Sequence, residues 1–244
     1  MKQGFFEIVE NIPLTSNVYR MILRGDTSDI TTAGQFINIK LDGMYLRRPI
    51  SVCDCDSETV TIIYKVVGKG TEAMSKLKSG KLDVLTGLGN GYDTSLSGDK
   101  PLLLGGGVGV PPLYLLAKKL IAEGKKVSVI LGFNTKDEVF YKDEFEALGA
   151  SVTVTTVDGS FGVKGFVTDA AKDMDYSYYY TCGPEPMLKA IYKSLSTSGQ
   201  LSFEERMGCG FGACMGCSCK TVTGYKRICK DGPVLKKEEI LWEK

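Results

Sequence analysis

The sequence predicts a β barrel or sandwich followed by a parallel α/β domain and a small cysteine-rich module. Three observations lead to this prediction. Short strands at close spacing fill residues 1–98, strands alternate with helices over residues 99–199, and five of the eight cysteines fall in residues 200–244. Closely spaced strands are typical of sandwiches and barrels, and strand-helix alternation is typical of a parallel sheet covered by crossover helices. We therefore divide the chain at these boundaries.

The first region is predicted to be rich in strands. Its apolar and β-branched segments are short and are separated by turns rich in Gly, Asp and Ser. One helix-like segment at residues 70–80 interrupts them, and a glycine-rich turn within residues 82–92 closes the region. The expected strands are GFFEIVENI, VYRMILRG, GQFINIKL, RRPISVCDC and TVTIIYKVV.

The second region alternates strands with helices from Lys100 onward. A helix between two strands returns the chain across the sheet, so these strands are expected to run parallel. The expected strands are PLLLGGG, KVSVILGF, SVTVTTV and SYYYTCG. The expected helices are PPLYLLAKKLIAEG, KDEFEALG, GFVTDAAKD and PEPMLKAIYKSLS.

Composition excludes several classes of function. Thirty basic and twenty-nine acidic residues give a formal net charge of +1, without the strongly basic region that binds a nucleic-acid backbone. No segment holds an apolar run long enough for a signal peptide or a membrane span. We therefore expect a cytoplasmic protein that binds neither nucleic acid nor membrane.

Cysteines cluster near the end of a chain that has no histidine. Five of the eight cysteines fall within the last 36 residues. In a cytosolic protein such clustering favours metal or cofactor ligation over disulfides. The absence of histidine excludes Ser-His-Asp and Cys-His catalysis, mixed Cys/His zinc sites and Rieske clusters.

The spacing of four cysteines indicates a [2Fe-2S] cluster. Cys209, Cys214 and Cys217 are arranged C-x4-C-x2-C, and Cys229 follows after eleven residues, as in plant-type ferredoxins. Glycines between them allow a tight loop whose backbone N–H groups face sulfide ions. Structural zinc sites more often use two separate C-x2–4-C pairs. Cys219 is interpreted as a core thiol, with a substitute ligand as the alternative.

A segment of the first region resembles a flavin motif. It is similar to the R-x-[YF]-S motif of the ferredoxin-NADP reductase superfamily, whose members bind FAD on a small antiparallel barrel. The resemblance implies that the arginine meets the FAD diphosphate, a bidentate contact suited to a guanidinium. The third motif residue here is isoleucine, where many relatives place an aromatic ring against the flavin. The matching residues are Arg48, Pro49, Ile50 and Ser51.

The same resemblance assigns two neighbouring segments. Gly70 and Thr71 would begin the helix of the barrel and present N–H groups and a hydroxyl to phosphate. The strand that lies along the flavin in the superfamily matches Ile63, Tyr64 and Lys65.

The turn LLLGGGVGVPP resembles the G-x-G-x-x-P nucleotide turn of the superfamily. It differs from the Rossmann G-x-G-x-x-G because Val110 stands where the third glycine would be. Glycines at a strand-to-helix turn let a pyrophosphate approach the helix N-terminus, and proline is favoured in the first turn. The matching residues are Gly107, Gly109 and Pro112.

The segment TCGPEPM resembles the C-G-P-x-x-M element at the end of the last core strand in the superfamily. There the cysteine lies near the nicotinamide and flavin rings, and the proline begins the next helix. Taken alone, such a cysteine is more often a buried apolar thiol. The matching residues are Cys182, Gly183, Pro184 and Met187.

The order of these motifs over the whole chain resembles the electron transfer subunits of class B dihydroorotate dehydrogenase. The resemblance implies an oxidoreductase subunit of pyrimidine biosynthesis. Electrons from the FMN of a dihydroorotate-oxidising partner would pass through the cluster and FAD to NAD+, in a heterotetramer with two copies of each subunit. Hydride transfer between cofactors needs no side-chain acid or base, so no catalytic side chain is expected, although Cys182 would lie near the nicotinamide.

Two alternatives stay open at this point. The small subunit of an NADPH-dependent ferredoxin reductase or sulfide dehydrogenase would use NADP. The segment LGFNTKDEVFY, however, offers one lysine and no arginine for a 2′-phosphate, which favours NAD. A zinc-stabilised binding module would use the same scaffold only for protein contacts, because a fold alone does not fix a function.

Overall fold

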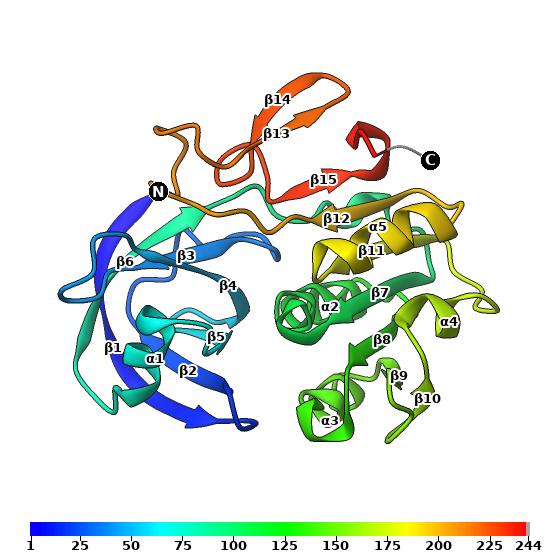
Figure 1. Ribbon diagram of the computed structural model, residues 1–244, viewed down its shortest axis with the longest axis horizontal. Coiled ribbons are helices and arrows are strands. Elements are labelled where there is room, and N and C mark those ends of the chain that lie inside the picture. Colours follow the sequence, from blue (N-terminus) through cyan, green and yellow to red (C-terminus); the bar gives the residue numbers. More distant parts are fainter. Residues whose placement is uncertain (243–244) are drawn as a thin grey trace.

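The computed structural model describes residues 1–242. A β barrel lies beside an α/β domain, and the C-terminal module lies along one side of both (Figure 1). Among the described residues, none of the helices combines the length and apolar character that a membrane span requires. The predicted fold class, a barrel followed by a parallel-sheet domain and a small module, is confirmed.

Six antiparallel strands close the barrel in the order β1-β2-β5-β4-β3-β6. Its interior is apolar, and Met21, Leu23 and Ile37 are fully buried there. Helix α1 (Lys69–Lys76) connects β5 to β6 and is tied to β1 by Asn11, whose Nδ2 donates to the Met74 carbonyl at 2.8 Å. The strands are β1 (Lys2–Pro13), β2 (Val18–Arg24), β3 (Phe36–Ile39), β4 (Arg48–Cys55), β5 (Thr59–Lys65) and β6 (Lys81–Leu88).

The α/β domain is built on a seven-stranded sheet in the order β10-β9-β8-β7-β11-β12-β15. All neighbouring pairs are parallel except β12 with β15. Its strands are β7 (Pro101–Gly106), β8 (Ser128–Phe133), β9 (Ser151–Thr156), β10 (Val163–Lys164), β11 (Tyr178–Cys182), β12 (Gly199–Ser202) and β15 (Val234–Lys236). Its helices are α2 (Pro112–Ala122), α3 (Lys142–Ala147), α4 (Val167–Ala171) and α5 (Glu185–Ser194).

The helices cover both faces of this sheet. Leu103 belongs to the apolar cluster of α2 and α3, whereas its neighbours Leu102 and Leu104 belong to the cluster of α4 and α5. Successive residues of a strand point to opposite faces, so a sheet covered on both sides needs continuous apolar strands. The run PLLLGG meets this requirement, and all six of its residues are buried.

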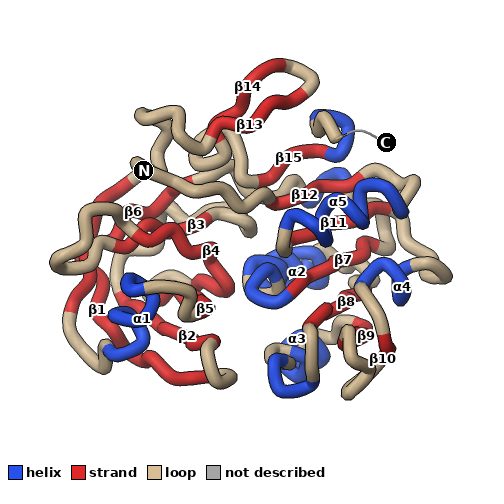
Figure 2. Tube along the Cα trace, viewed as in Figure 1, coloured by secondary structure: helices blue, strands red, loops and turns tan. Residues whose placement is uncertain are grey.

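The C-terminal module is mostly loop (Figure 2). Strands β13 (Ser218–Thr221) and β14 (Gly224–Arg227) form a hairpin, and β15 then pairs antiparallel with β12. The boundary proposed between residues 199 and 200 falls at the start of β12. The third region therefore supplies the edge strand of the sheet in the second region. The sequence did not predict β12 or β15, because three or four residues are too few to display a period.

Four short 3-10 turns complete the described structure. One of them, η2, occupies the turn after β7, and another, η3, follows β8. They are η1 (Thr94–Leu96), η2 (Gly107–Gly109), η3 (Lys136–Glu138) and η4 (Lys237–Glu239).

The barrel and the α/β domain are joined directly. Helix α2 packs against β4, and Lys118 pairs with Asp54 across this contact at 3.0 Å. Two tyrosine hydroxyls add hydrogen bonds between the units. Tyr92 donates to the Thr181 carbonyl at 3.1 Å, and Tyr180 donates to the carbonyl of Asp93 at 2.9 Å. These contacts fix the barrel opposite the ends of β7 and β11, where the predicted nucleotide turns lie.

Candidate functional site

The four cysteines of the predicted cluster lie in two pairs. The Cys209 N–H donates to the Cys214 sulfur at 3.5 Å, and the Cys229 N–H donates to the Cys217 sulfur at 3.4 Å. The segments that carry the two pairs are joined by Arg227, two residues before Cys229, whose Nη1 donates to the carbonyl of Gly212 at 3.0 Å. Cys217 and Cys229 are buried, whereas Cys214 is exposed. One pair therefore faces the interior of the module and the other faces its surface.

Backbone N–H groups converge on the outer pair of sulfurs, those of Cys209 and Cys214. The N–H groups of Ala213 and Cys214 donate to the Cys209 sulfur at 3.2 and 3.4 Å, and that of Gly216 donates to the Cys214 sulfur at 3.5 Å. Partial burial acts to raise the pKa of Cys209, but hydrogen bonds from Phe211, Cys214 and Ala213 outweigh it and lower the pKa to about 6. The loop thus stabilises thiolates, which are the form that ligates iron.

The arrangement in pairs bears on the choice between zinc and iron-sulfur. A structural zinc ion needs four ligands about one point. A [2Fe-2S] cluster divides four thiolates between two irons. Two adjoining thiol pairs, wrapped by N–H donors, fit the cluster better than a zinc ion.

Arg48 lies at the N-terminus of α1. Its side chain covers Gly70, and a β carbon added to that glycine would overlap the Arg48 Nε atom. A guanidinium beside the first N–H groups of a helix is suited to a diphosphate.

The hydroxyl of Thr71, predicted to contact phosphate, makes hydrogen bonds to the backbone of the preceding turn. It accepts from the Val67 N–H at 2.9 Å and donates to the Gly68 carbonyl, so in the structure it shapes the turn before the helix.

The barrel opens between β4 and β5 beside this arginine. The two strands pair only through Val52–Cys55 and Val60–Ile62, so residues 48–51 and 63–65 leave facing edges unpaired with each other. The predicted flavin residues Pro49, Ile50, Ser51, Ile63, Tyr64 and Lys65 all lie on these edges. The ring of Tyr64 points into the barrel core, where its hydroxyl donates to Asn11 at 3.0 Å. Contact between Tyr64 and a flavin would therefore use its backbone.

A cavity of about 730 Å³ adjoins these residues. Arg48 and Pro49 line one side, and residues 204–207, which lead into the cysteine loop, line the other. The start of β4 and the segment that leads into the predicted cluster loop thus face each other across one space. The cavity is lined by Tyr45, Leu46, Arg47, Arg48, Pro49, Glu204, Glu205, Arg206 and Met207.

The two predicted nucleotide elements are in direct contact. Gly109 packs so closely on the end of β11 that a β carbon would overlap the Cys182 carbonyl. Met187 fills the space under Gly106 and Gly183, where added β carbons would lie 2.5 Å from its Sδ and Cε atoms. Gly107 has φ +52° and open space beside it. Small residues therefore let the turn after β7 and the turn after β11 form one surface.

The two prolines stand at the beginnings of helices, and the thiol stands at the end of a strand. Pro112 is the first residue of α2, and Pro184 precedes the first residue of α5. Cys182 is half-buried at the end of β11, and loss of hydration raises the pKa of its thiol to about 12. A raised pKa favours the neutral thiol over the thiolate, which is the nucleophilic form.

Two families match the chain. Residues 204–241 match the iron-sulfur cluster binding domain of dihydroorotate dehydrogenase B, and residues 103–193 match the oxidoreductase NAD-binding domain.

Curated relatives match this chain over almost its full length. The dihydroorotate dehydrogenase B (NAD(+)) electron transfer subunit of Fusobacterium nucleatum is 47% identical, covering 93% of this chain and 94% of its own. That of Bacillus pumilus is 46% identical, covering 98% of both chains.

The chain belongs to the family of dihydroorotate dehydrogenase B electron transfer subunits. It is therefore an oxidoreductase subunit with an iron-sulfur cluster domain and an NAD-binding domain.

Solved structures place the family among the ferredoxin-NADP reductase folds. The structure of an NADH-dependent reduced ferredoxin-NADP oxidoreductase, described for flavin-based electron bifurcation, superposes with a TM-score of 0.88 at 31% identity. It covers 98% of this chain and 90% of its own. A ferredoxin NADP+ reductase from Neisseria gonorrhoeae with bound FAD and NADP has a TM-score of 0.70 at 16% identity, over 80% of this chain and 90% of its own, and shares the fold.

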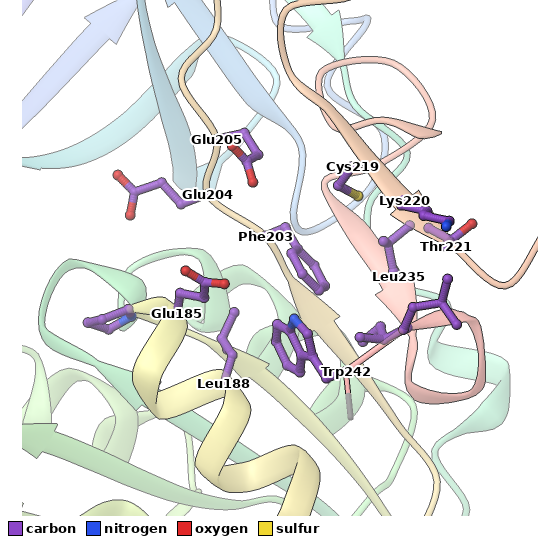
Figure 3. A pocket seen from close by; sticks show the side chains of 13 residues that line it. Glu185, Leu188, Phe203, Glu204, Glu205, Cys219, Lys220, Thr221, Leu235 and Trp242 are labelled. Carbon is purple, nitrogen blue, oxygen red and sulfur yellow. The ribbon is translucent and has the colours of Figure 1, made fainter. Parts of the chain in front are cut away.

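A second cavity of about 430 Å³ lies between α5 and the C-terminal module (Figure 3). Trp242 and Phe203 form part of its wall, with ring centroids 5.3 Å apart. Cys219 also lines it and is half-buried, and burial raises the pKa of its thiol. The Cys219 sulfur is approached by the N–H group of Cys219 itself, whereas N–H groups of several residues surround the sulfurs of Cys209 and Cys214. The role of Cys219 as a packing thiol stays a prediction.

Sequence patterns missed two side chains beside the predicted cofactor residues. Asn38 in β3 donates from Nδ2 to the Cys209 carbonyl at 3.3 Å. Tyr92 joins the barrel to β11. A weak signal existed for Asn38, because asparagine is depleted in strands and here stands in the apolar segment FINI.

Proposed function

We propose that this chain relays electrons from the FMN of a dihydroorotate-oxidising partner to NAD+ through a [2Fe-2S] cluster and FAD, in pyrimidine biosynthesis. The observation that carries the proposal is the contact of the paired-cysteine loop with the flavin-type barrel, where Asn38 of β3 donates to the Cys209 carbonyl at 3.3 Å. When bound, the cluster exchanges single electrons and FAD exchanges one or two, so together they connect one-electron chemistry to hydride transfer. The three units proposed to do this are residues 1–98, 99–199 and 200–244.

We propose Cys209, Cys214, Cys217 and Cys229 as the iron ligands. The loop holds the outer pair with N–H donors, which stabilise negative charge on sulfur in both oxidation states. Gly210 and Gly212, with φ +79° and +92°, permit the conformation that aims these donors inward.

We propose that FAD lies along the open edge between β4 and β5. Arg48 and the N-terminus of α1 would hold its diphosphate, and the unpaired backbone edges of the two strands would hold its ring system. The proposed residues are Arg48, Pro49, Ile50, Ser51, Ile63, Tyr64, Lys65, Gly70 and Thr71, the last through its role in the turn.

We propose that NAD binds at the carboxyl ends of β7, β8 and β11. The residues assigned are Gly107, Gly109, Pro112, Cys182, Gly183, Pro184 and Met187. The turn after β8 favours NAD over NADP. It carries Asp137 and Glu138 beside the single basic residue Lys136, and acidic residues suit free ribose hydroxyls rather than a 2′-phosphate. The protein aligns and encloses the rings, and needs no side-chain acid or base.

Members of the family are subunits of dihydroorotate dehydrogenase B, which implies a catalytic partner subunit. We further propose that this partner contains FMN, that the assembly holds two copies of each subunit, and that it is cytoplasmic. The exposed apolar residues around the outer thiol pair support a partner contact there. They are Phe211, with 41% of its surface exposed, and Met215, with 53%.

The decisive test compares Cys214→Ser with Cys219→Ser in the purified complex. Cys214→Ser should abolish dihydroorotate-dependent reduction of NAD+ while FAD stays bound, because the cluster loses a ligand. Cys219→Ser should keep iron, sulfide and activity. Iron and sulfide content, flavin absorbance and turnover are measured on both. A Cys214→Ser complex that reduces NAD+ at the wild-type rate would show that the cluster is not the relay.

A second candidate function is the small subunit of an NADPH-dependent ferredoxin reductase or sulfide dehydrogenase. The superposition on a ferredoxin-NADP oxidoreductase with TM-score 0.88 supports it. Assays of the same purified complex with dihydroorotate, ferredoxin and sulfide distinguish the two functions. Activity with dihydroorotate supports the first proposal, and a flavin and iron-sulfur complex that responds only to ferredoxin or sulfide supports the second.

A further inference from the structure

We propose that Asn38 is the positioning residue that couples the flavin strands to the first cluster ligand and raises the reduction potential of the cluster. The inference rests on the proposed function, because it assumes that Cys209 ligates iron and that the barrel holds FAD. Asn38 is 1% exposed, and its Nδ2 donates to the Cys209 carbonyl at 3.3 Å. It thus links a barrel strand directly to the backbone of the cysteine loop.

The loop is shaped to receive this side chain. Gly210 follows Cys209 with φ +79°, and a β carbon at Gly210 would overlap the Asn38 Nδ2 atom. Only glycine fits here, both for its conformation and for the space that it leaves. The asparagine and the glycine therefore form a matched contact that fixes the peptide between Cys209 and Gly210.

The barrel holds Asn38 rigidly on its other side. Asn38 is in register with Pro49 of the flavin strand β4. Arg47 donates from Nη1 to the Asn38 carbonyl at 3.3 Å, and its Nη2 is bidentate to the Asp83 carboxylate at 3.0 Å for both oxygens. A displacement of Asn38 would disturb both the flavin strand and this ion pair.

An apolar residue would satisfy packing better than Asn38 does. Its Oδ1 is buried and has no hydrogen-bond partner among residues 1–242. A buried acceptor without a partner is unfavourable, so packing alone does not account for an amide in a strand interior. The NH2 group of the amide accounts for the asparagine at this position, because this group donates to the cluster loop at Cys209.

The direction of the electronic effect follows from charge. Reduction adds one negative charge to the cluster, and the positive end of the Nδ2–H dipole lies against the peptide of its first ligand. Hydrogen bonds near cluster sulfurs and their ligands tune the reduction potential. Removal of this donor should therefore lower the reduction potential of the cluster. At equilibrium, a larger share of the electrons should then reside on the flavin.

The test is a redox titration of the purified holoprotein, with the cluster followed by EPR and the flavin by visible absorbance. Asn38→Leu removes the donor and keeps the number and branching of the side-chain heavy atoms, and Asn38→Ala, which leaves more room, is measured beside it. We expect iron and FAD contents equal to wild type, and an electron distribution between FAD and cluster shifted about tenfold, which is about 59 mV for a one-electron couple. The flavin potential should not move.

Asn90→Ala is the matched control. Asn90 also joins the barrel to the C-terminal module, with its Nδ2 donating to the Val234 carbonyl at 2.7 Å and to the Asp231 carbonyl at 3.4 Å. Among residues 1–242, the hydrogen bonds of its side chain go to residues 231 and 234 and not to the loop of residues 209–217. An unchanged cluster potential in both Asn38 variants would overturn the proposal, as would an equal shift in Asn90→Ala or loss of the cluster from both Asn38 variants. Absence of a cluster signal from the wild type would instead overturn the proposed function.

Discussion

The side chain of Arg48 lies directly over Gly70, so that the first turn of α1 and the start of β4 share one small space. A side chain at position 70 and the guanidinium cannot both occupy it. The arrangement places a fixed positive charge at a helix N-terminus, where the partial charges of free N–H groups already favour an anion.

Gly70→Ala should weaken FAD binding by about tenfold or more, because the new methyl group displaces Arg48 from the helix end. Gly68→Ala is a suitable control, since its φ of −178° is extended and a β carbon there meets nothing within 4 Å. The ratio of flavin to protein absorbance after gel filtration measures both. Equal FAD retention in the two variants would argue against the phosphate site.

Gly109→Ala should impair NAD+ reduction and leave FAD and iron in place. The added methyl group would overlap the Cys182 carbonyl and separate the turns after β7 and β11, which together form the proposed nicotinamide site. We expect KM for NAD+ to rise about tenfold. Val108→Ala changes an adjacent side chain that is 38% exposed and should behave as wild type.

Phe211→Glu combined with Met215→Glu should weaken assembly with the catalytic partner. Both side chains are exposed beside the outer thiol pair, and a charge buried in an apolar contact is strongly unfavourable. NADH oxidation by an artificial electron acceptor should stay unchanged in the isolated subunit. Phe5→Glu, on the barrel surface with 72% exposure, is the control in gel filtration of the mixed subunits.

Trp242→Ala should destabilise the chain by roughly 2 kcal/mol, since the indole packs on other aromatic rings and leaves a cavity when removed. Its ring lies 5.5 Å from Tyr192 of α5 and 5.3 Å from Phe203, so it ties the end of the described chain to the α/β domain. Denaturant unfolding measures the loss. Leu241→Ala, at a side chain 49% exposed, should cost much less.

Stability should fall at alkaline pH. Burial raises the pKa of the Cys182 thiol and of the Tyr64 hydroxyl to about 12 each. In the unfolded chain these groups ionise near pH 8.5 and 10. Between those values and 12 the unfolded state binds fewer protons than the folded state, so the free energy of unfolding declines as pH rises.

We expect a loss of roughly 1–2 kcal/mol between pH 7.5 and pH 10 from Cys182. Urea unfolding at the two pH values measures it, and Cys182→Ala should reduce the decline. A free energy of unfolding that rises over this interval would contradict the assignment of a buried neutral thiol.

Local patterns were sufficient for much of the architecture. Runs such as PLLLGG predict a strand covered on both faces, and the C-x4-C-x2-C spacing predicts a cluster loop, because both depend on neighbours in the sequence. The turns that contain glycine and Pro112 or Pro184 likewise predict the helices that follow them.

Contacts between distant segments were decided only by the tertiary structure. The choice of a closed barrel over a sandwich depends on the pairing of β1 with β6, and the pairing of β12 with β15 unites two regions that the sequence separates. The turn role of Thr71 and the inward ring of Tyr64 likewise depend on backbone geometry that a motif does not encode.

The sequence by itself predicted most of the element types and the cluster spacing, because periodicity, turn residues and ligand spacing act over a few positions, and the resemblance of its motifs implied the flavin, the nucleotide and the family. Only the tertiary structure decided that Asn38 meets Cys209 across 171 positions of the chain, that the flavin strands open beside Arg48, and that the cysteines lie in two pairs. The physical reason is that strand pairing and packing bring together residues whose distance in the sequence carries no periodic signal.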